Sequence, residues 1–502
     1  MTGNASPEPS PTAPLDDGRA AARGGLSLLV LQTFGRLLGL VFIFVATRQL
    51  IPAEFGRYST VAGVVVLGSF LADFGTSSAM TRLLGRRPAD ADRLLAGTIG
   101  ASLLLGIVAY GAVVGFAAIA YQGPIIGDMA IGALAIPSAS VLSSLLGALD
   151  GVGLIARRAL VTALQTFVVS AGVVPVLLGS GVRGALAALA LAPAVSLLPA
   201  MQTLRRSGIW RSRPRTDPAT IRILLRAAVP FALTGGLSAL TMRFDVVFLS
   251  LVRSTAETAR YDLALRLLEA GTYMSTALTA PLFFLLSRRL GANDIEGARR
   301  AYGEAVRLLY LLGLPISIGV LLLARPIVDV ALGPGYGAAA LPLAIMGAAQ
   351  WVNWLNYAQG SLIMAGNFVR RGVGVAGLLT GITLILDVLL IPTLGPTGAA
   401  IAMVATWTLS AVLFHRLHAR TVGIVTPVPS IRLLIPAVAM AIAVFPLRDR
   451  PLPVPVLAGA CLYVAGVCLS GAVTGADRRR VVRMLRRTAE AADRPTDGEA
   501  RP

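Results

Sequence analysis

Long apolar segments alternate with short polar segments along most of this chain. One helical crossing of a bilayer needs about 20 predominantly apolar residues, and this alternation predicts about 14 crossings. They are expected at residues 27–47, 58–80, 94–121, 125–149, 159–179, 183–204, 222–251, 262–286, 304–325, 337–365, 370–391, 395–416, 429–446 and 453–473. The pattern therefore predicts an all-α polytopic membrane protein.

Composition and charge support this class and limit the partners. Hydrophobic residues make up 55% of the 502 positions and charged residues 14%, whereas soluble domains carry about 25% charged residues. The net charge of +19 comes from 44 basic residues, all arginines, which lie mostly in short loops. That placement predicts contact with anionic membrane lipids and argues against a nucleic-acid partner. With the N-terminus inside, most of these arginines fall on the cytoplasmic side, so both termini are expected to be cytoplasmic.

Two pairs of segments recur in order and indicate an internal duplication. Gly153–Arg158 is followed by an apolar run and a small-residue helix start, and Gly366–Arg371 is followed by the same features. Phe55–Ser59 resembles Thr258–Asp262 in the same way. The halves are spans 1–6 and 7–12, and an even number of crossings gives both halves the same orientation. We therefore expect two parallel six-helix repeats around a central cavity, plus two C-terminal helices.

The duplication sets the expected domain organisation. The parts in chain order are a disordered cytoplasmic leader at 1–25, an N-lobe at 26–204, a basic cytoplasmic linker at 205–221, a C-lobe at 222–418, spans 13 and 14 at 429–473, and a cytoplasmic tail at 476–502.

Charged residues inside spans are the first candidates for a site, because each costs about 2.5–3.5 kcal/mol to insert. Arg36 and Arg243 occupy equivalent spans of the two halves, so they are expected to face each other across the cavity. A guanidinium there can bind a phosphate with two hydrogen bonds. The alternative is that each arginine is held by a carboxylate, Arg243 by Asp245 or Glu269.

The eighth span begins with a ladder of charges. Asp262 and Arg266 are four residues apart and Arg266 and Glu269 three apart, so all three share one helix face. Such a ladder lines the cavity entrance or fixes this span to its neighbour, and both interpretations stay open.

The tenth span carries a polar and aromatic stripe at helical spacing, formed by Gln350, Asn353, Trp354 and Tyr357. Aromatic faces beside amides suit contact with sugar rings and their hydroxyls. Hydrogen bonding between helices is the other interpretation.

Other chemistry is sparse. Asp73 and Asp387 lie at or within spans and are candidates for carrying a coupling proton or sodium ion. His415 and His418 lack the neighbours of a metal site, so no metal is expected. Without lysine the chain cannot form a lysine-containing phosphate loop for ATP, and we expect no catalytic site and no cofactor.

Three segments resemble one known family. Leu50–Tyr58 is similar to the L-x-P-x-x-F/Y-G-x-Y segment of bacterial polysaccharide flippases. Leu389–Ala402 is similar to their LIP-x-x-G-x-x-GAAIA segment, and Asp245 with Tyr261–Arg266 fits the start of their second half. The resemblance covers roughly residues 25–470. It implies the O-antigen-type oligosaccharide-lipid flippases of the multidrug/oligosaccharidyl-lipid/polysaccharide exporter superfamily, which have two MATE-like lobes.

The resemblance implies a transporter and not an enzyme. Such a protein flips a polyprenyl-pyrophosphate-linked oligosaccharide from the inner to the outer leaflet of the bacterial cytoplasmic membrane by alternating access. The product feeds cell-surface polysaccharide biosynthesis, with glycan-assembly enzymes as partners. The alternatives are a peptidoglycan-precursor lipid flippase, whose multi-arginine first span is matched here by one arginine, and a MATE-type ion-coupled drug antiporter.

Overall fold

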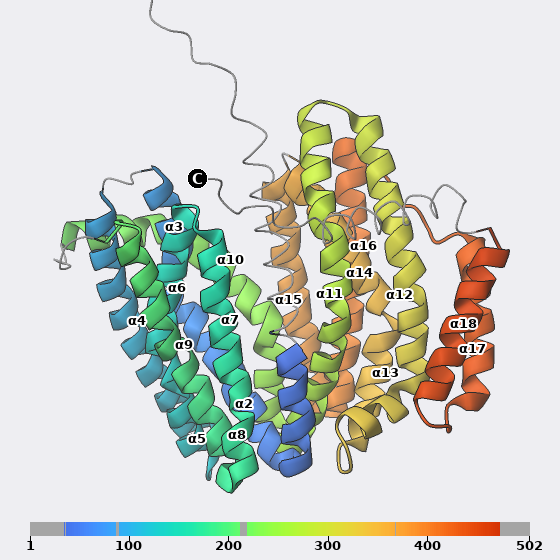
Figure 1. The fold of residues 1–502 in the computed structure, drawn as a ribbon, viewed down its shortest axis with the longest axis horizontal. Helices are drawn as coiled ribbons and strands as arrows, with labels where there is room; N and C mark the ends of the chain where they lie inside the picture. The colour runs from blue at the N-terminus through green and yellow to red at the C-terminus, as the bar shows by residue number, and fades with distance from the viewer. Residues whose placement is uncertain (1–34, 36, 87–89, 211–217, 367, 472–502) are drawn as a thin grey trace, which may run out of the picture. The chain divides into compact units, whose positions relative to one another are not determined.

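The computed structural model describes residues 35, 37–86, 90–210, 218–366 and 368–471, and the regular elements in these residues are helices (Figure 1). A helix at Leu37–Gln49 comes first. The labelled helices that follow are α2 (Pro52–Asp73), α3 (Thr76–Arg86), α4 (Ala91–Ala120), α5 (Ile125–Ala133), α6 (Ala135–Gly151), α7 (Ile155–Ala171), α8 (Val173–Pro175), α9 (Gly181–Arg206), α10 (Pro218–Val252), α11 (Thr255–Gly291), α12 (Ile295–Ala331), α13 (Ala340–Ala348), α14 (Gln350–Ala365), α15 (Val369–Leu394), α16 (Pro396–Val422), α17 (Ile431–Val444) and α18 (Pro453–Leu469).

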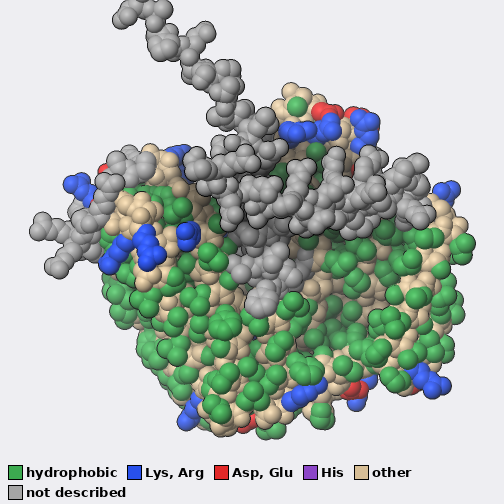
Figure 2. All heavy atoms as spheres, in the orientation of Figure 1, with side chains coloured by type: hydrophobic (Ala, Val, Ile, Leu, Met, Phe, Trp, Pro, Cys, Tyr) green, Lys and Arg blue, Asp and Glu red, His purple; other side chains and the backbone are tan. Residues whose placement is uncertain are grey.

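Many of these helices are long enough to span a membrane. Among the described residues, eight helical segments are long and apolar enough to cross a bilayer, or nine if the bent pair α13–α14 is one span. Three shorter apolar helices are Leu37–Gln49, Ile431–Leu447 and Pro453–Leu469. Hydrophobic side chains cover the flanks of the visible helices and arginines gather at their ends (Figure 2). The chain is thus a multi-pass α-helical membrane protein, as the hydropathy pattern predicts, while the count of 14 stays a prediction.

The expected span 58–80 is broken in the middle. α2 ends at Asp73, Phe74 adopts the left-handed conformation, and Gly75 follows with φ of +72°. A side chain at Gly75 would lie 2.7 Å from the carbonyl oxygen of Ala228 in α10. Glycine is required here both by the backbone conformation and by this close approach, so the chain turns into α3 at this point.

The chain forms two compact units, which we describe separately. Unit 1 holds residues 1–271, 331–342 and 373–406, and unit 2 holds residues 272–330, 343–372 and 407–502. The leader at 1–25, the tail at 476–502 and the middle of the expected linker lie outside the described residues. The division into an N-lobe and a C-lobe remains a prediction.

In unit 1, α2 packs against α4, α5, α6, α9 and α10. A core of fully buried side chains joins α3, α4 and α6, with Met80, Leu95 and Leu145 at its centre. At the start of α2 the two repeated segments meet: the Cβ position of Gly56 lies 1.7 Å from the carbonyl oxygen of Thr255, the first residue of α11. The duplicated segments therefore pack directly on one another within this unit.

A buried carboxylate joins three helices of unit 1 near this contact. Asp128 of α5 is fully buried, and its oxygens lie 2.9 Å from Nη1 of Arg57 in α2 and 3.6 Å from Nε of Arg183 in α9. Because an unpaired buried carboxylate would be costly, these arginines hold the ends of the three helices together.

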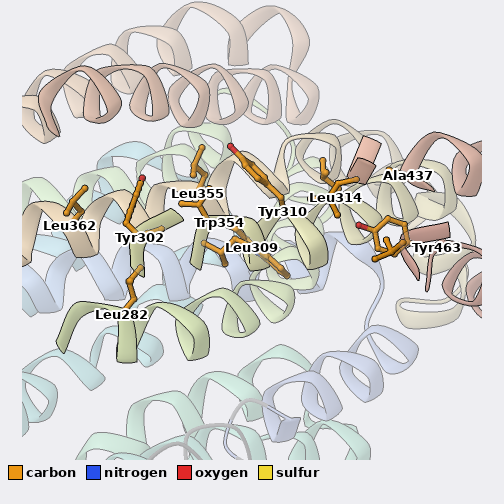
Figure 3. Close-up of a cluster of buried hydrophobic side chains, with 14 of the residues drawn as sticks. Leu282, Tyr302, Leu309, Tyr310, Leu314, Trp354, Leu355, Leu362, Ala437 and Tyr463 are labelled. Atoms are coloured by element: carbon orange, nitrogen blue, oxygen red, sulfur yellow. The ribbon is translucent and has the colours of Figure 1, made fainter. Parts of the chain in front are cut away.

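In unit 2, aromatic residues of α12 and α14 form the core together with α17 and α18 (Figure 3). Trp354 is fully buried, and the hydroxyls of Tyr302 and Tyr310 both bond the segment that precedes α17. Tyr463 of α18 donates a 2.9 Å hydrogen bond to the carbonyl oxygen of Leu311 in α12. Buried tyrosines need such partners, and these bonds fix the last two helices to the unit.

Candidate functional site

The charge ladder of α11 forms a buried cluster in unit 1. Asp262 is 1% exposed, and its Oδ2 accepts a 2.7 Å hydrogen bond from Nε of Arg266, one helical turn later. Its Oδ1 lies 3.4 Å from Nη1 of Arg243 on α10. Glu269 stands at the more open end, with Oε1 4.0 Å from Nη2 of Arg243. One carboxylate thus holds two arginines from two helices.

Arg243 therefore lies against carboxylates, as one of the two interpretations from the sequence proposed, but its shorter contact is with Asp262. Asp245 does not pair with it. The Asp245 carboxylate instead accepts a hydrogen bond from the hydroxyl of Tyr261 and one of 2.7 Å from the backbone N–H of Val246. Residues two apart on a helix point to different faces, which explains why Arg243 and Asp245 take different partners.

A second carboxylate lies close to Asp245. Asp387 of α15 is 1% exposed and lies within electrostatic range of Asp245 and Tyr261. Within the described part of the chain its Oδ2 accepts no hydrogen bond. Two buried carboxylates within electrostatic range of each other favour binding a proton or a cation, since two bare negative charges in an apolar region repel each other.

Residues from α2 complete the arginine cluster. Tyr58 and Ser59 are buried beside the Asp262 carboxylate. Sequence reasoning did not assign them to the site. The available signal was the duplication, because Phe55–Ser59 and Thr258–Asp262 are repeat equivalents and such segments meet where a repeat axis passes.

The other candidates lie elsewhere or cannot be placed. Arg36 lies outside the described residues. Asp73 accepts 3.4 Å hydrogen bonds from Thr76 and from the backbone N–H of Ser77, and it lines a cavity of about 300 Å³ in unit 1 with Ser143 and Gln165.

The four residues of the polar and aromatic stripe on α14 lie in unit 2, and they differ in how deeply they are buried. Gln350 is 1% exposed and donates a 3.0 Å hydrogen bond to the hydroxyl of Thr272, and Trp354 lies in the core. Tyr357 is 39% exposed, and Asn353 is half-buried. In this structure two of the four residues therefore hold the helix in place, and Asn353 and Tyr357 keep exposed surface.

Solved structures define the class of protein. The chain is similar to a lipid II flippase MurJ in an inward closed conformation, with a TM-score of 0.76 and 12% identity over 89% of this chain and 99% of that one. An inward-facing multidrug resistance MATE family transporter gives a TM-score of 0.60 and 17% identity over 80% of this chain and 98% of that one. At these identities the likeness concerns the fold alone: the chain has a helical transporter fold of the MurJ and MATE type.

The family follows from the sequence itself. A model of the family described as polysaccharide biosynthesis protein matches residues 21–285, more than half of the chain, and the chain belongs to this family. The probable flippase AglR of Haloferax volcanii is 26% identical over 232 residues, 44% of this chain and 48% of that protein. The probable lipid II flippase MurJ of Rhizobium meliloti is 26% identical over 277 residues, 53% of this chain and 51% of that protein. The chain thus spans about half the length of these relatives.

Proposed function

We propose that this protein flips a polyprenyl-pyrophosphate-linked oligosaccharide from the inner to the outer leaflet of a bacterial cytoplasmic membrane by alternating access. The observation that carries the proposal is the half-buried, loosely held guanidinium of Arg243. Its contacts with Asp262 and Glu269 measure 3.4 and 4.0 Å, whereas Arg266 holds Asp262 at 2.7 Å. Arg243 can therefore exchange a carboxylate for the diphosphate of a substrate while Arg266 keeps Asp262 charged and in place.

The relatives support the substrate class. The chain belongs to a polysaccharide biosynthesis family, and both relatives above are named as flippases. In the proposal, Asn353 and Tyr357 contact sugar rings, Gln350 and Trp354 support their helix, and Arg36 serves as the counterpart of Arg243. Both termini face the cytoplasm, where glycan-assembly enzymes supply the substrate.

Replacing Arg243 by alanine tests the proposal. In proteoliposomes that contain a fluorescent polyprenyl-diphosphate oligosaccharide, we expect flipping by R243A to be at least about tenfold slower than by the wild type. The reason is that a charged hydrogen bond to the phosphate is worth roughly 1.5–3 kcal/mol. The measurement is the rate at which label that starts in the inner leaflet becomes accessible to a quencher that cannot cross the membrane.

Arg325→Ala is the matched control, because Arg325 is 69% exposed and pairs only locally with Asp329. It should flip at the wild-type rate. A drug antiporter would instead export organic cations and tolerate R243A, and this outcome would refute the proposal. The lipid II relative favours the peptidoglycan precursor as a second candidate substrate, and running the same assay with that lipid compares the two.

We also propose that Asp387 and Asp245 carry the coupling proton or sodium ion. Both carboxylates are buried in unit 1 within electrostatic range of each other, whereas Asp73 already has hydrogen-bond donors on its Oδ1. Asp387→Asn is therefore expected to remove the dependence of the flipping rate on an imposed proton or sodium gradient. Asp73→Asn is expected to retain that dependence. Equal gradient dependence in D387N and the wild type would contradict the assignment.

A further inference from the structure

A cavity of about 840 Å³ opens at one end of unit 2, away from every residue assigned above. Four helix ends enclose it: the last turn of α11, the end of α14, the first turn of α15 and the end of α16. A volume of this size suits a lipid headgroup or a small organic anion. In the expected topology this end of the unit faces the cytoplasm.

The walls of the cavity are basic. Arg370 and Arg371, in the first turn of α15, both line it, and none of the described residues that line it is acidic. Within the described part of the chain, neither guanidinium has an ion pair or a hydrogen-bond partner. The other polar side chains among the lining residues are Ser287 and Thr421. The positive end of the α15 dipole adds to the attraction for an anion.

The carboxylate in the turn that follows α11 is already occupied. Asp294, in the turn between α11 and α12, accepts a hydrogen bond from Arg289 and one of 2.8 Å from the backbone N–H of Gly297. The hydrogen bond from Arg289 holds the pKa of Asp294 below its usual value. This carboxylate therefore stays charged and bound to its own partners, and it does not neutralise the cavity.

The duplication provides an internal comparison. Arg157 and Arg158 are the repeat equivalents of Arg370 and Arg371, and there Arg158 pairs with Asp150 at 3.3 Å. The residue at the position equivalent to Asp150 is Ile363, so the second copy lacks the carboxylate. A positive-inside anchor needs charge near the headgroups but no cavity. The second copy differs from the first in lacking this counter-ion, and its two arginines line the cavity.

We propose that this cavity binds a phosphate or diphosphate group at the cytoplasmic face, held by the forks of Arg370 and Arg371. The group comes either from the headgroup of an anionic membrane lipid or from a soluble phosphate compound, and the chemistry of recognition is the same. The inference does not depend on the proposed transport function, because the site lies in unit 2 and its occupancy can be measured without transport.

The test compares two double variants of the full-length protein. R370Q/R371Q removes the proposed contacts, and R157Q/R158Q removes the same charge from the equivalent turn of the first copy. Calorimetry in detergent measures the affinity for inorganic diphosphate, and native mass spectrometry measures the phosphatidylglycerol retained from mixed phosphatidylglycerol and phosphatidylcholine nanodiscs.

We expect at least about a tenfold loss in one of these readouts for R370Q/R371Q and wild-type behaviour for R157Q/R158Q, because each charged hydrogen bond is worth about one tenfold step or more. Loss of phosphatidylglycerol alone identifies a lipid headgroup, and loss of diphosphate binding alone identifies a soluble ligand. S287F, which fills the cavity without changing charge, should have the same effect. If both readouts stay unchanged in R370Q/R371Q and in S287F, the proposal is wrong.

Discussion

Asp262→Asn is expected to destabilise the protein by about 3–5 kcal/mol and to abolish transport. Asp262 is 1% exposed and is the shared partner of Arg243 and Arg266. Asparagine keeps the volume of the side chain but removes the negative charge, so two largely buried guanidinium groups lose their counter-ion. Removing one member of a buried ion pair typically costs about this much. The unfolding free energy in detergent and the flipping rate in proteoliposomes are the two measurements.

The matched control for this prediction is Asp329→Asn. Asp329 is 50% exposed and Arg325 is 69% exposed, and exposed pairs contribute only about 0–1 kcal/mol. Both variants replace an aspartate that pairs with an arginine one turn away on the same helix, and they differ in burial. If D262N and D329N lose the same stability, Asp262 is not the electrostatic centre of the cluster.

A double variant separates the lost attraction from the orphaned charge. Asp262→Asn removes the partner of the shorter ion pair, the one with Arg266. Adding Arg266→Met then removes the guanidinium that this change leaves unpaired. It should therefore recover part of the lost stability. Transport should not recover, because Arg243 still lacks the partner that positions it.

Local helix spacing was enough to predict part of this site. Asp262 and Arg266 are one turn apart, and their pairing follows from α-helical geometry alone. The sequence left Asp245 open as a partner of Arg243, although residues two apart on a helix do not face each other. Their actual partners, Asp262 and Tyr261, lie on α11. That choice depends on how α10 and α11 pack, which a single-sequence pattern does not contain.

The stripe on α14 shows the same limit more clearly. Helical periodicity correctly puts Gln350 and Trp354 on one face, but it does not say which element covers that face. In the structure the core of unit 2 covers Trp354. A buried indole in a packed core and an indole that stacks on a sugar have the same spacing, so only tertiary contacts distinguish them.

The sequence contains a signal for the break in the second expected span, but an average of hydropathy does not detect it. Asp73 is the only charged residue in the window over residues 58–80, and an average of hydropathy treats the window as one helix. Gly75 two positions later is the residue that permits a positive φ. The polar residue followed by glycine marks the end of α2 more accurately than the mean does.

Gly56→Ala is expected to reduce both stability and transport. The added Cβ would lie 1.7 Å from the carbonyl oxygen of Thr255, a distance that no carbon–oxygen contact tolerates. Because this neighbour is backbone at the start of a helix, no side-chain rotation relieves the clash, and α2 has to move away from α11. Overpacking of this kind costs about 1–3 kcal/mol, occasionally more. Thermal unfolding in detergent measures this cost.

The same displacement should reach the charged cluster. Tyr58 and Ser59 follow Gly56 within one turn and lie beside Asp262, so moving α2 uncovers the carboxylate that holds Arg243. Gly111→Ala in α4 is the control, since nothing lies within 4 Å of its Cβ position. Alanine there should stabilise the helix by about 0.5–1 kcal/mol. Slower flipping in G56A at a temperature where it remains folded, together with wild-type flipping in G111A, would show that the contact between the two repeated segments supports the site as well as the fold. Wild-type flipping in both variants would show that this contact supports the stability of the fold and not the site.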